Sequence, residues 1–320
     1  MATIELHQLS LIELAKRSLH ADELLPIVEL MVKRNRWLED ATWVESNKTT
    51  SHLFPIRTHE PTGSPRELNK GIPVEASGVS QLEEPLMMLE GESVIDERWL
   101  QLSRNRLKAR SDEDKSFISG MGKTVAEILV YGNRADDPRI ITGWAPRMND
   151  ESDDYVIDAG GSTNLTSLYL VQWGEQYCSM IYPQGSETMG IRSEDMMRNR
   201  VLDSDSNPYW AWITHFYYDF GFMRQNPRCL IRIANIDTQA TTLPDIDDML
   251  IDAMHESEND AENMVIYGNR DVMKIFDKKA KDKSNVNYDQ DTVWGRVQTY
   301  FRTAPLKLME TISSNETRVV

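Results

Sequence analysis

The alternation of apolar and polar positions is clearest in the middle of the chain. The sequence SLYLVQWG at residues 167–174 is followed closely by YCSMIYPQGS at residues 177–186. Both runs are rich in the β-branched, aromatic and large aliphatic side chains that fill a pleated, half-buried surface, so each predicts a strand. Gly174 lies between them, and Pro183 and Gly185 follow the second run. The pattern therefore predicts a β-hairpin with a Pro-Gly exit, inside a strand-rich region over residues 160–237.

Apolar residues at helical spacing predict five helices. Two of them, over residues 6–19 and 22–32, form an N-terminal arm that packs on another structure. The longest lies over residues 103–131 and would be about 40 Å long. Two further helices are predicted over residues 243–254 and 270–281, on either side of a short strand at residues 264–267.

Residues 51–90 have a different character. Prolines and glycines recur through this segment, with short extended pieces between them and few apolar side chains. Such a segment cannot build a core, and an isolated two-stranded ribbon is only marginally stable in water. We therefore expect this ribbon to pack against a neighbouring structure.

Composition narrows the class of protein. The chain has 320 residues, a formal net charge of −16 and a sequence pI near 4.9. This length allows two modest subdomains with their own cores. The acidic balance argues against a protein that follows a phosphate backbone, although it leaves room for a local basic patch. No apolar run reaches the roughly 20 residues that span a bilayer, and no secretory signal pattern is present, so we expect folding in a cytoplasm.

The residue types that bind metals are few and scattered. Cys178 and Cys229 give neither a disulfide framework nor a zinc spacing, and we interpret them as small buried side chains on strands. No two of the six histidines are three or four residues apart, as ligands on one helix face would be. We therefore expect no metal site and no cofactor.

Three motifs approach a ligand site without fulfilling its pattern. Residues 120–124 read GMGKT, like the end of a phosphate-binding loop, but Phe117 stands where that loop needs glycine. The carboxylates of residues 245–256 lack the alternating spacing and the glycine of a calcium loop, which favours a solvated helix face. The aromatic cluster at residues 209–218 could stack bases, but no Arg or Lys occurs between residues 201 and 223. We interpret it as a strand that buries aromatics against a sheet.

Several short phrases occur in the order that is typical of one family. Residues 167–186 resemble a signature in which a strand ending in Trp-Gly is followed by a strand reading roughly Ile-Tyr-Pro-x-Gly-Ser. The other landmarks are LEDATW at 38–43, LNKG at 68–71, YGN at 131–133, TGWAP at 142–146, IDAG at 157–160, YDFG at 218–221, RIANID at 232–237, FRTAP at 301–305 and NETR at 315–318. In this joint order, the chain resembles the major capsid proteins of epsilon-fifteen-like short-tailed bacteriophages.

The resemblance implies an α+β chain with the HK-97-type capsid fold. An N-terminal helical arm would occupy residues 1–50 and an extended loop residues 51–91. A peripheral domain with a long spine helix over about 103–131 would occupy residues 92–159, and an axial domain residues 160–290. Residues 291–320 would form C-terminal strands that return to the axial and peripheral domains.

The resemblance also implies a structural function rather than an enzymatic one. The chain would be the major capsid protein of a tailed double-stranded DNA bacteriophage, self-assembling into pentamers and hexamers of an icosahedral shell. It would assemble in the bacterial host cytoplasm and reside in the virion capsid. An encapsulin-like cellular shell protein of the same fold is one alternative, and an acidic soluble α/β enzyme is another.

The implied partners are further copies of the chain, a portal protein, a scaffolding protein, a cement or decoration protein, and packaged double-stranded DNA through weak non-specific contacts. No membrane is among them. Because no large scaffolding segment precedes the family-like region, we expect the scaffold to be a separate chain.

The candidate site residues lie at the tip of the predicted ribbon. Arg66, Glu67, Leu68 and Lys70 combine two cations, one anion and one apolar side chain in a segment rich in proline and glycine. We expect them to contact an adjacent subunit, with the cations meeting carboxylates and Leu68 acting as an apolar anchor. We expect no catalytic residue.

Overall fold

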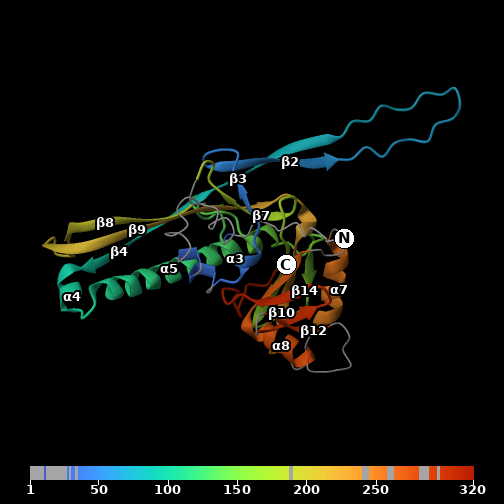
Figure 1. Cartoon of the computed structure of the whole chain (residues 1–320). Helices are drawn as coiled ribbons and strands as arrows, with labels where there is room; N and C mark the ends of the chain where they lie inside the picture. Colours follow the sequence, from blue (N-terminus) through green and yellow to red (C-terminus); the bar gives the residue numbers. More distant parts are fainter. Residues whose placement is uncertain are drawn as a thin grey trace, which may run out of the picture.

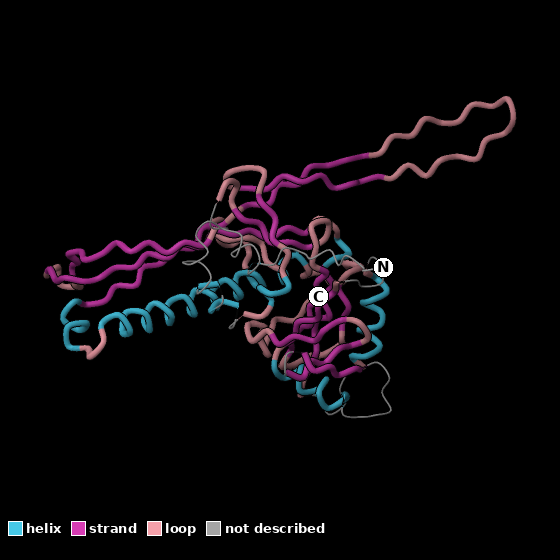
Figure 2. The backbone as a smooth tube through the Cα atoms, viewed as in Figure 1, coloured by secondary structure: helices cyan, strands magenta, loops and turns pink. Residues whose placement is uncertain are grey.

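The computed structural model describes residues 11, 27–28, 30–32, 35–186, 190–239, 245–257, 263–280, 288–293 and 296–320. A body built around a seven-stranded sheet carries two projections that point in opposite directions (Figure 1). One projection is an arm of long strands beside a long helix, and the other is a two-stranded ribbon that ends in an extended loop (Figure 2). Every described helix is too short or too polar to cross a membrane.

The seven-stranded sheet has the order β12-β13-β14-β11-β6-β10-β5. Its strands are β5 (Val156–Asp158), β6 (Leu165–Gln172), β10 (Leu230–Asp237), β11 (Met264–Gly268), β12 (Tyr288–Val293), β13 (Arg296–Phe301) and β14 (Ala304–Leu308). Helices α7 (Ile246–Glu256) and α8 (Arg270–Ala280) share a hydrophobic core with it. Every residue of β6 is buried, because Leu168 and Leu170 face this helical core while Tyr169 and Val171 face a second one.

The second sheet has the order β1-β7-β9-β4, with β8 paired to the outer half of β9. Its strands are β1 (Trp43–Glu45), β4 (Met87–Asp96), β7 (Cys178–Tyr182), β8 (Ile191–Leu202) and β9 (Pro208–Arg224). The long β9 continues outward past β7, so β4, β8 and β9 together form the strands of the arm (Figure 1). Helices α4 (Glu97–Leu102) and α5 (Arg106–Tyr131) complete it.

Helix α5 confirms the long helix predicted over residues 103–131 and starts three residues later. Its 26 residues correspond to a length of about 39 Å. The side chain of Asn105 caps the first turn by accepting a backbone hydrogen bond of 3.1 Å. On the sheet side, Phe117 stacks on Phe216 with ring centroids 5.4 Å apart. Glycine is required at Gly91, because a Cβ there would lie 2.6 Å from the Phe117 ring.

Residues 167–186 contain two strands as predicted, but the predicted hairpin is wrong. Strand β6 pairs with β10 and β11, whereas β7 pairs with β1 and β9. The two strands are joined by an isolated bridge between Trp173 and Cys178. Each strand is hydrogen-bonded to strands that lie far away in the sequence, so the local turn at Gly174 does not determine the pairing.

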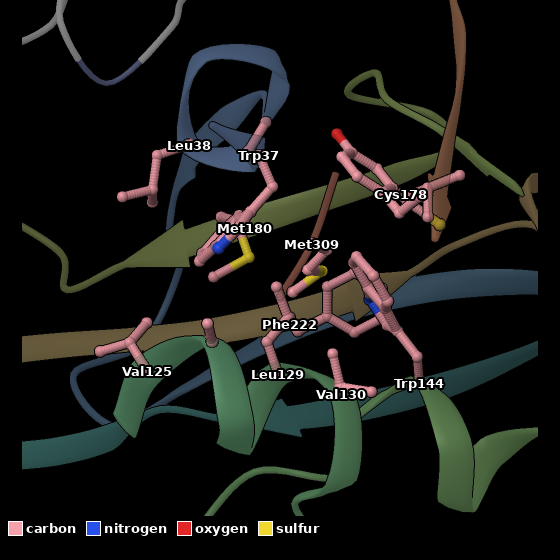
Figure 3. Packing of buried hydrophobic residues seen from close by; sticks show 14 of the residues in the cluster. Trp37, Leu38, Val125, Leu129, Val130, Trp144, Cys178, Met180, Phe222 and Met309 are labelled. Carbon is pink, nitrogen blue, oxygen red and sulfur yellow. The ribbon is translucent and has the colours of Figure 1, made fainter. Parts of the chain in front are cut away.

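The two sheets meet at a cluster of aromatic rings. Trp144 from α6 (Trp144–Arg147) is fully buried, and its ring centroid lies 5.6 Å from Tyr169, 6.3 Å from Trp173, 6.3 Å from Phe222 and 5.7 Å from Tyr267. Figure 3 shows Trp144 and Phe222 packed together with side chains of α5. Rings at these separations and inclined to one another add to the stability from burial alone. This cluster forms the centre of the core between body and arm.

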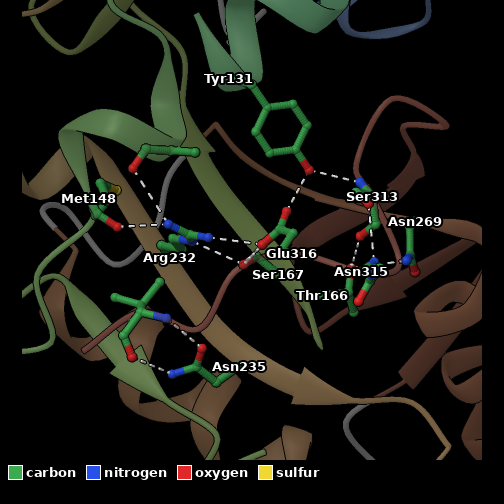
Figure 4. A network of polar contacts seen from close by, with 12 residues as sticks. Tyr131, Met148, Thr166, Ser167, Arg232, Asn235, Asn269, Ser313, Asn315 and Glu316 are labelled. Atoms are coloured by element: carbon green, nitrogen blue, oxygen red, sulfur yellow. Dashed lines mark hydrogen bonds and ion pairs between the residues drawn. The ribbon is translucent and has the colours of Figure 1, made fainter. Parts of the chain in front are cut away.

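A buried ion pair ties the C-terminal tail to both sheets (Figure 4). Glu316 accepts hydrogen bonds from Arg232 at 2.9 Å and from the hydroxyls of Tyr131 and Ser167. Arg232 also donates to the carbonyl oxygen of Met148 at 2.9 Å. Burial, followed by the adjacent Glu316 carboxylate, holds the pKa of Tyr131 well above its usual range, which keeps this phenol a donor. The tail therefore joins α5 to β6 and β10.

The expected domain limits need three corrections. Trp43–Glu45 is β1 and pairs with β7, so the end of the expected 1–50 arm is a strand of the second sheet. Residues 87–91 lie in β4 and pair with β9, so they are not part of the expected 51–91 loop. Residues 191–220 lie in the arm rather than with the rest of the expected 160–290 domain, because β9 pairs with β4 and β8 up to Phe220, whereas residues 221–224 pair with β7.

Other predicted elements can be compared directly. Helices α7 and α8 and strand β11 confirm the elements predicted near residues 243–254, 270–281 and 264–267. Most of the two N-terminal helices predicted over residues 6–19 and 22–32 lies outside the described residues. Of that segment, Leu11, Val28, Met31 and Val32 are buried in the chain's own core.

We predict that Glu316→Gln destabilises the subunit by about 3–5 kcal/mol, because it leaves the buried Arg232 charge without its counter-ion. Urea unfolding of the purified subunit measures this change. Glu310→Gln is the matched control, since the Arg270–Glu310 pair is 67% and 68% exposed and its loss should cost about 1 kcal/mol or less. Equal effects of the two substitutions would contradict the structural role of the buried pair.

Candidate assembly surfaces

The ribbon consists of β2 (Ser51–His59) and β3 (Gly78–Pro85), and a buried ion pair holds its root. Arg147 donates two hydrogen bonds to the Glu84 carboxylate, at 2.7 and 2.8 Å, and a third to the carbonyl oxygen of Thr142 at 3.0 Å. The guanidinium also lies 5.5 Å from the ring centre of Phe222. This bidentate geometry fixes β3 against the central core of the subunit.

Apolar packing supports the same end of the ribbon. Phe54 is buried against Ile181 of β7 and Met223 of β9. Pro85 lies so close to β9 that a Cβ on Gly221 would be 2.9 Å from its carbonyl oxygen, which explains the glycine there. Ile56, the next residue on the same face, is partly buried against the same cluster. The subunit thus anchors the root of the ribbon but not its outer part.

The outer part of the ribbon has no support from its own subunit. Every residue from 60 to 77 is exposed, and these residues form no regular secondary structure beyond a turn (Figure 2). The carboxylate of Glu75 accepts hydrogen bonds from the backbone of Thr62 and Gly63 at 3.0 and 3.2 Å, which links the two sides of the loop. Local hydrogen bonds alone therefore shape this segment.

The four residues predicted from the sequence lie in one tight turn at the tip. Lys70 forms an ion pair with Glu67, and its backbone amide donates to the Glu67 carbonyl oxygen at 3.3 Å. Arg66 donates to the carbonyl oxygen of Lys70 at 2.9 Å. Leu68 is 94% exposed. Because Lys70 is paired inside the turn, the tip presents one cation, Arg66, and one apolar side chain.

The sequence reasoning missed two apolar residues of this loop. Ile72 and Val74 are 58% and 98% exposed. They are separated by one residue, as side chains on the same side of an extended chain are. This alternation is visible in the sequence, but the surrounding prolines and glycines obscured it. With Leu68, they form an exposed apolar series, which we call the ribbon tip: Leu68, Ile72 and Val74.

The aromatic cluster at residues 209–218 is only partly buried. Phe216 and Tyr218 are buried, and Phe216 stacks on Phe117 of α5, but Trp210 is 47% exposed. Cations also reach these rings from neighbouring elements: Arg198 lies 4.3 Å from the Trp210 ring centre, and Arg192 lies 4.6 Å from that of Tyr217. Arg192 and Arg198 belong to β8, which pairs with β9. The sequence of β9 alone therefore could not show that cations lie beside its aromatic rings.

The other candidate ligand sites have structural explanations. Residues 120–124 lie inside α5, where a phosphate-binding loop cannot form. Cys178 and Cys229 are both buried and unpaired by a disulfide, and the Cys178 thiol donates to the Cys229 carbonyl oxygen at 3.6 Å. On α7, Asp247 forms an ion pair with Lys279. Within the described ranges, no group of His, Cys, Asp or Glu side chains is arranged to hold a metal ion.

A polar cavity of about 1110 Å³ lies between α5 and the C-terminal tail. Its walls mix Lys123 and Arg36 with Glu127, Asp136 and Glu310, so neither sign of charge dominates. This arrangement does not favour an anionic or a cationic ligand. The distinctive surfaces of the subunit are therefore its two projections.

Comparison with known proteins agrees with this geometry. The family model of major capsid protein GP7 matches residues 20–320. No curated protein matches the chain. Among solved structures, the chain is similar to a chain of the near-atomic-resolution structure of bacteriophage Epsilon15, with 25% identity, a TM-score of 0.66 and 88% of each chain covered.

Two more distant structures extend the comparison. The capsid of bacteriophage JBD30 has 8% identity and a TM-score of 0.52, with 85% of this chain and 88% of the other covered, which supports the same fold. The SrpI encapsulin of Synechococcus elongatus PCC 7942 has 10% identity and a TM-score of 0.43, with 65% and 90% covered, and carries no argument at that score. The chain therefore belongs to the major capsid protein GP7 family, and it is the α+β, HK-97-type subunit of an icosahedral capsid of a tailed bacteriophage.

Proposed function

We propose that the ribbon is the extended loop of this capsid subunit and that it works between subunits. The observation that carries this proposal is the contrast along its length. Phe54 and Glu84 anchor the root, whereas every residue from 60 to 77 is exposed. Apolar side chains such as Leu68 and Val74 contribute a favourable free energy only when another surface removes them from water.

In this proposal, the turn residues Arg66, Glu67, Leu68 and Lys70 contact an adjacent subunit. Leu68, Ile72 and Val74 supply the apolar contact, and Arg66 meets a carboxylate of the acidic neighbour. Lys70 and Glu67 either keep their mutual ion pair or exchange it for partners on that neighbour. Many such weak contacts, repeated by symmetry, would close pentamers and hexamers into a shell.

The remaining parts take corresponding roles in the proposal. Helix α5 and the arm strands form the peripheral domain, and the seven-stranded sheet with α7 and α8 forms the axial domain. The function is structural and involves no catalysis. The further partners are a portal protein, a separate scaffolding protein, a cement or decoration protein and the packaged DNA, and assembly takes place in the cytoplasm of the host.

We predict that replacing residues 61–73 by a short Gly-Ser turn prevents shell formation, or yields shells that fall apart. Unfolding of the isolated subunit should remain nearly unchanged, because these residues bury almost no surface in their own chain. Electron microscopy and thermal unfolding measure the two effects. Normal shells, or a subunit that unfolds at lower temperature, would contradict the proposed role of the ribbon.

A milder variant tests the apolar contact alone. We predict that Leu68→Ser with Val74→Ser lowers the yield of shells without changing subunit stability, because each residue loses an apolar contact made only in the shell. Val320→Ser is the matched control, since Val320 is 83% exposed and lies outside the ribbon. Equal yields from both variants would show that the tip makes no apolar contact.

We also predict weak binding of DNA. A chain with a net charge of −16 presents a mostly neutral or negative surface, and tight contacts with many phosphates would hinder packaging and release. Empty shells should retain little duplex DNA at physiological salt in a sedimentation assay. Tight retention with a steep dependence on salt would contradict this prediction.

A further inference from the structure

The corner between α4 and α5, at the far end of the arm, carries a run of cations. Residues 98–110 hold five Arg and Lys side chains and no carboxylate, so removing them from the net charge of −16 leaves −21 for the remainder. Arg104, Arg106 and Lys108 are exposed and form no ion pair with any residue in the described part of the chain. Arg110 is paired with Asp195 at 2.6 Å, and carboxylates flank the run on both sides, so the free positive charge of the corner comes from Arg104, Arg106 and Lys108.

Large apolar side chains are exposed among these cations. The corner between α4 and α5 buries Leu100, but Trp99, Leu102 and Leu107 remain 49%, 77% and 83% exposed. Apolar and aromatic side chains surrounded by cations are typical of a protein-binding surface rather than of a solvated one. We call this surface the basic corner: Arg98, Trp99, Leu102, Arg104, Arg106, Leu107 and Lys108.

The side of the arm presents the complementary surface. On the face of the sheet opposite α5, the register places Glu92, His215 and Glu194 in one row and Glu90, Tyr217 and Arg192 in the next. Met88 and Asp219 pair beside them, and Met88 is 69% exposed. We call this face the acidic flank: Met88, Glu90, Glu92, Val94, Glu194 and Asp219.

The carboxylates of the acidic flank outnumber the cations that face them. Glu90 and Glu92 lie 3.5 Å from the two ring nitrogens of His215 and are both 51% exposed. Arg192 stacks on Tyr217. Burial raises the pKa of Asp219, Arg192 opposes this shift and Glu90 adds to it. A cationic partner would relieve this crowding of negative charge.

We propose that the basic corner of one copy of the chain binds the acidic flank of a second copy. The two surfaces match in charge, and each carries exposed apolar side chains, Leu102 and Leu107 on one and Met88 and Val94 on the other. One surface lies at the end of the arm and the other on its side, so the contact is heterologous, and around a symmetry axis of the shell it would form a ring of arms. It is independent of the role proposed for the ribbon.

A nucleic acid is a less suitable occupant of the basic corner. Phosphates would match Arg104 and Arg106, but they would leave Leu102 and Leu107 exposed to water. The remaining charge of −21 on each subunit would also repel the duplex. A second copy of the chain would both pair the charges and cover the apolar side chains of the two surfaces.

Charge reversal tests the proposal. Arg106→Glu with Lys108→Glu places carboxylates in the first turn of α5, where they favour the helix, so the subunit should fold normally. We predict that the yield of shells falls about tenfold or more, because close charge pairs become repulsive. Adding Glu90→Lys and Glu92→Lys should restore the yield. A double reversal on α8, Lys274→Glu with Lys278→Glu, is the matched control and should leave it unchanged.

Two results of this experiment would overturn the proposal. One is a normal yield from the Arg106 and Lys108 reversal, and the other is a lost yield that the flank reversal does not restore. In the first case, shells that retain less duplex DNA than the unaltered shells would assign the corner to nucleic acid. The ribbon variants test the proposed function independently of this contact, because they leave the basic corner and the acidic flank unaltered.

Crosslinking tests the contact directly. Leu107→Cys combined with Met88→Cys should give disulfide-linked subunits in oxidised shells, seen in non-reducing gels. The native Cys178 and Cys229 do not compete, because both are fully buried. Leu107→Cys combined with Leu308→Cys is the control, since Leu308 lies in β14 on the other sheet. Shells of the first variant without the crosslink would contradict the proposed contact.

Discussion

The buried pair of Arg232 and Glu316 is the junction on which the arrangement of the subunit depends. It joins the C-terminal tail to β6, β10 and α5, and it has side-chain exposures of 4% and 6%. A charge pair at this depth is costly to break, because either partner alone would be a buried, unpaired ion. The Arg147–Glu84 pair likewise joins the root of the ribbon to the core of the subunit. These two junctions set the directions in which the arm and the ribbon leave the body.

Beyond these junctions, the chain holds surface that its own fold does not bury. The ribbon tip exposes Leu68, Ile72 and Val74, and the basic corner exposes Leu102 and Leu107. A protein that remained a monomer would gain nothing from apolar side chains at the ends of long projections. In a shell, the same side chains can meet neighbours at every repeat of the symmetry. In the proposed account, the subunit is a packed body whose two projections bind neighbouring subunits.

Local patterns in the sequence predicted the elements well and the pairing of strands poorly. Helices α5, α7 and α8 follow from periodicity and caps, which depend on neighbouring residues. The hairpin at residues 167–186 was wrong because β6 and β7 each pair with distant strands. The four predicted contact residues, Arg66, Glu67, Leu68 and Lys70, lie within five consecutive positions, so the sequence could group them. The acidic flank combines β4, β8 and β9, and only the fold brings its carboxylates together.

Amide hydrogen exchange on free subunits and on assembled shells tests the central claim most directly. The account predicts that residues 60–77 and 98–108 exchange rapidly in the free subunit and become protected in the shell. Strands β6 and β10, which are already buried in one subunit, should change little. Equally rapid exchange of both projecting segments in intact shells would contradict the claim that they are the surfaces that join subunits.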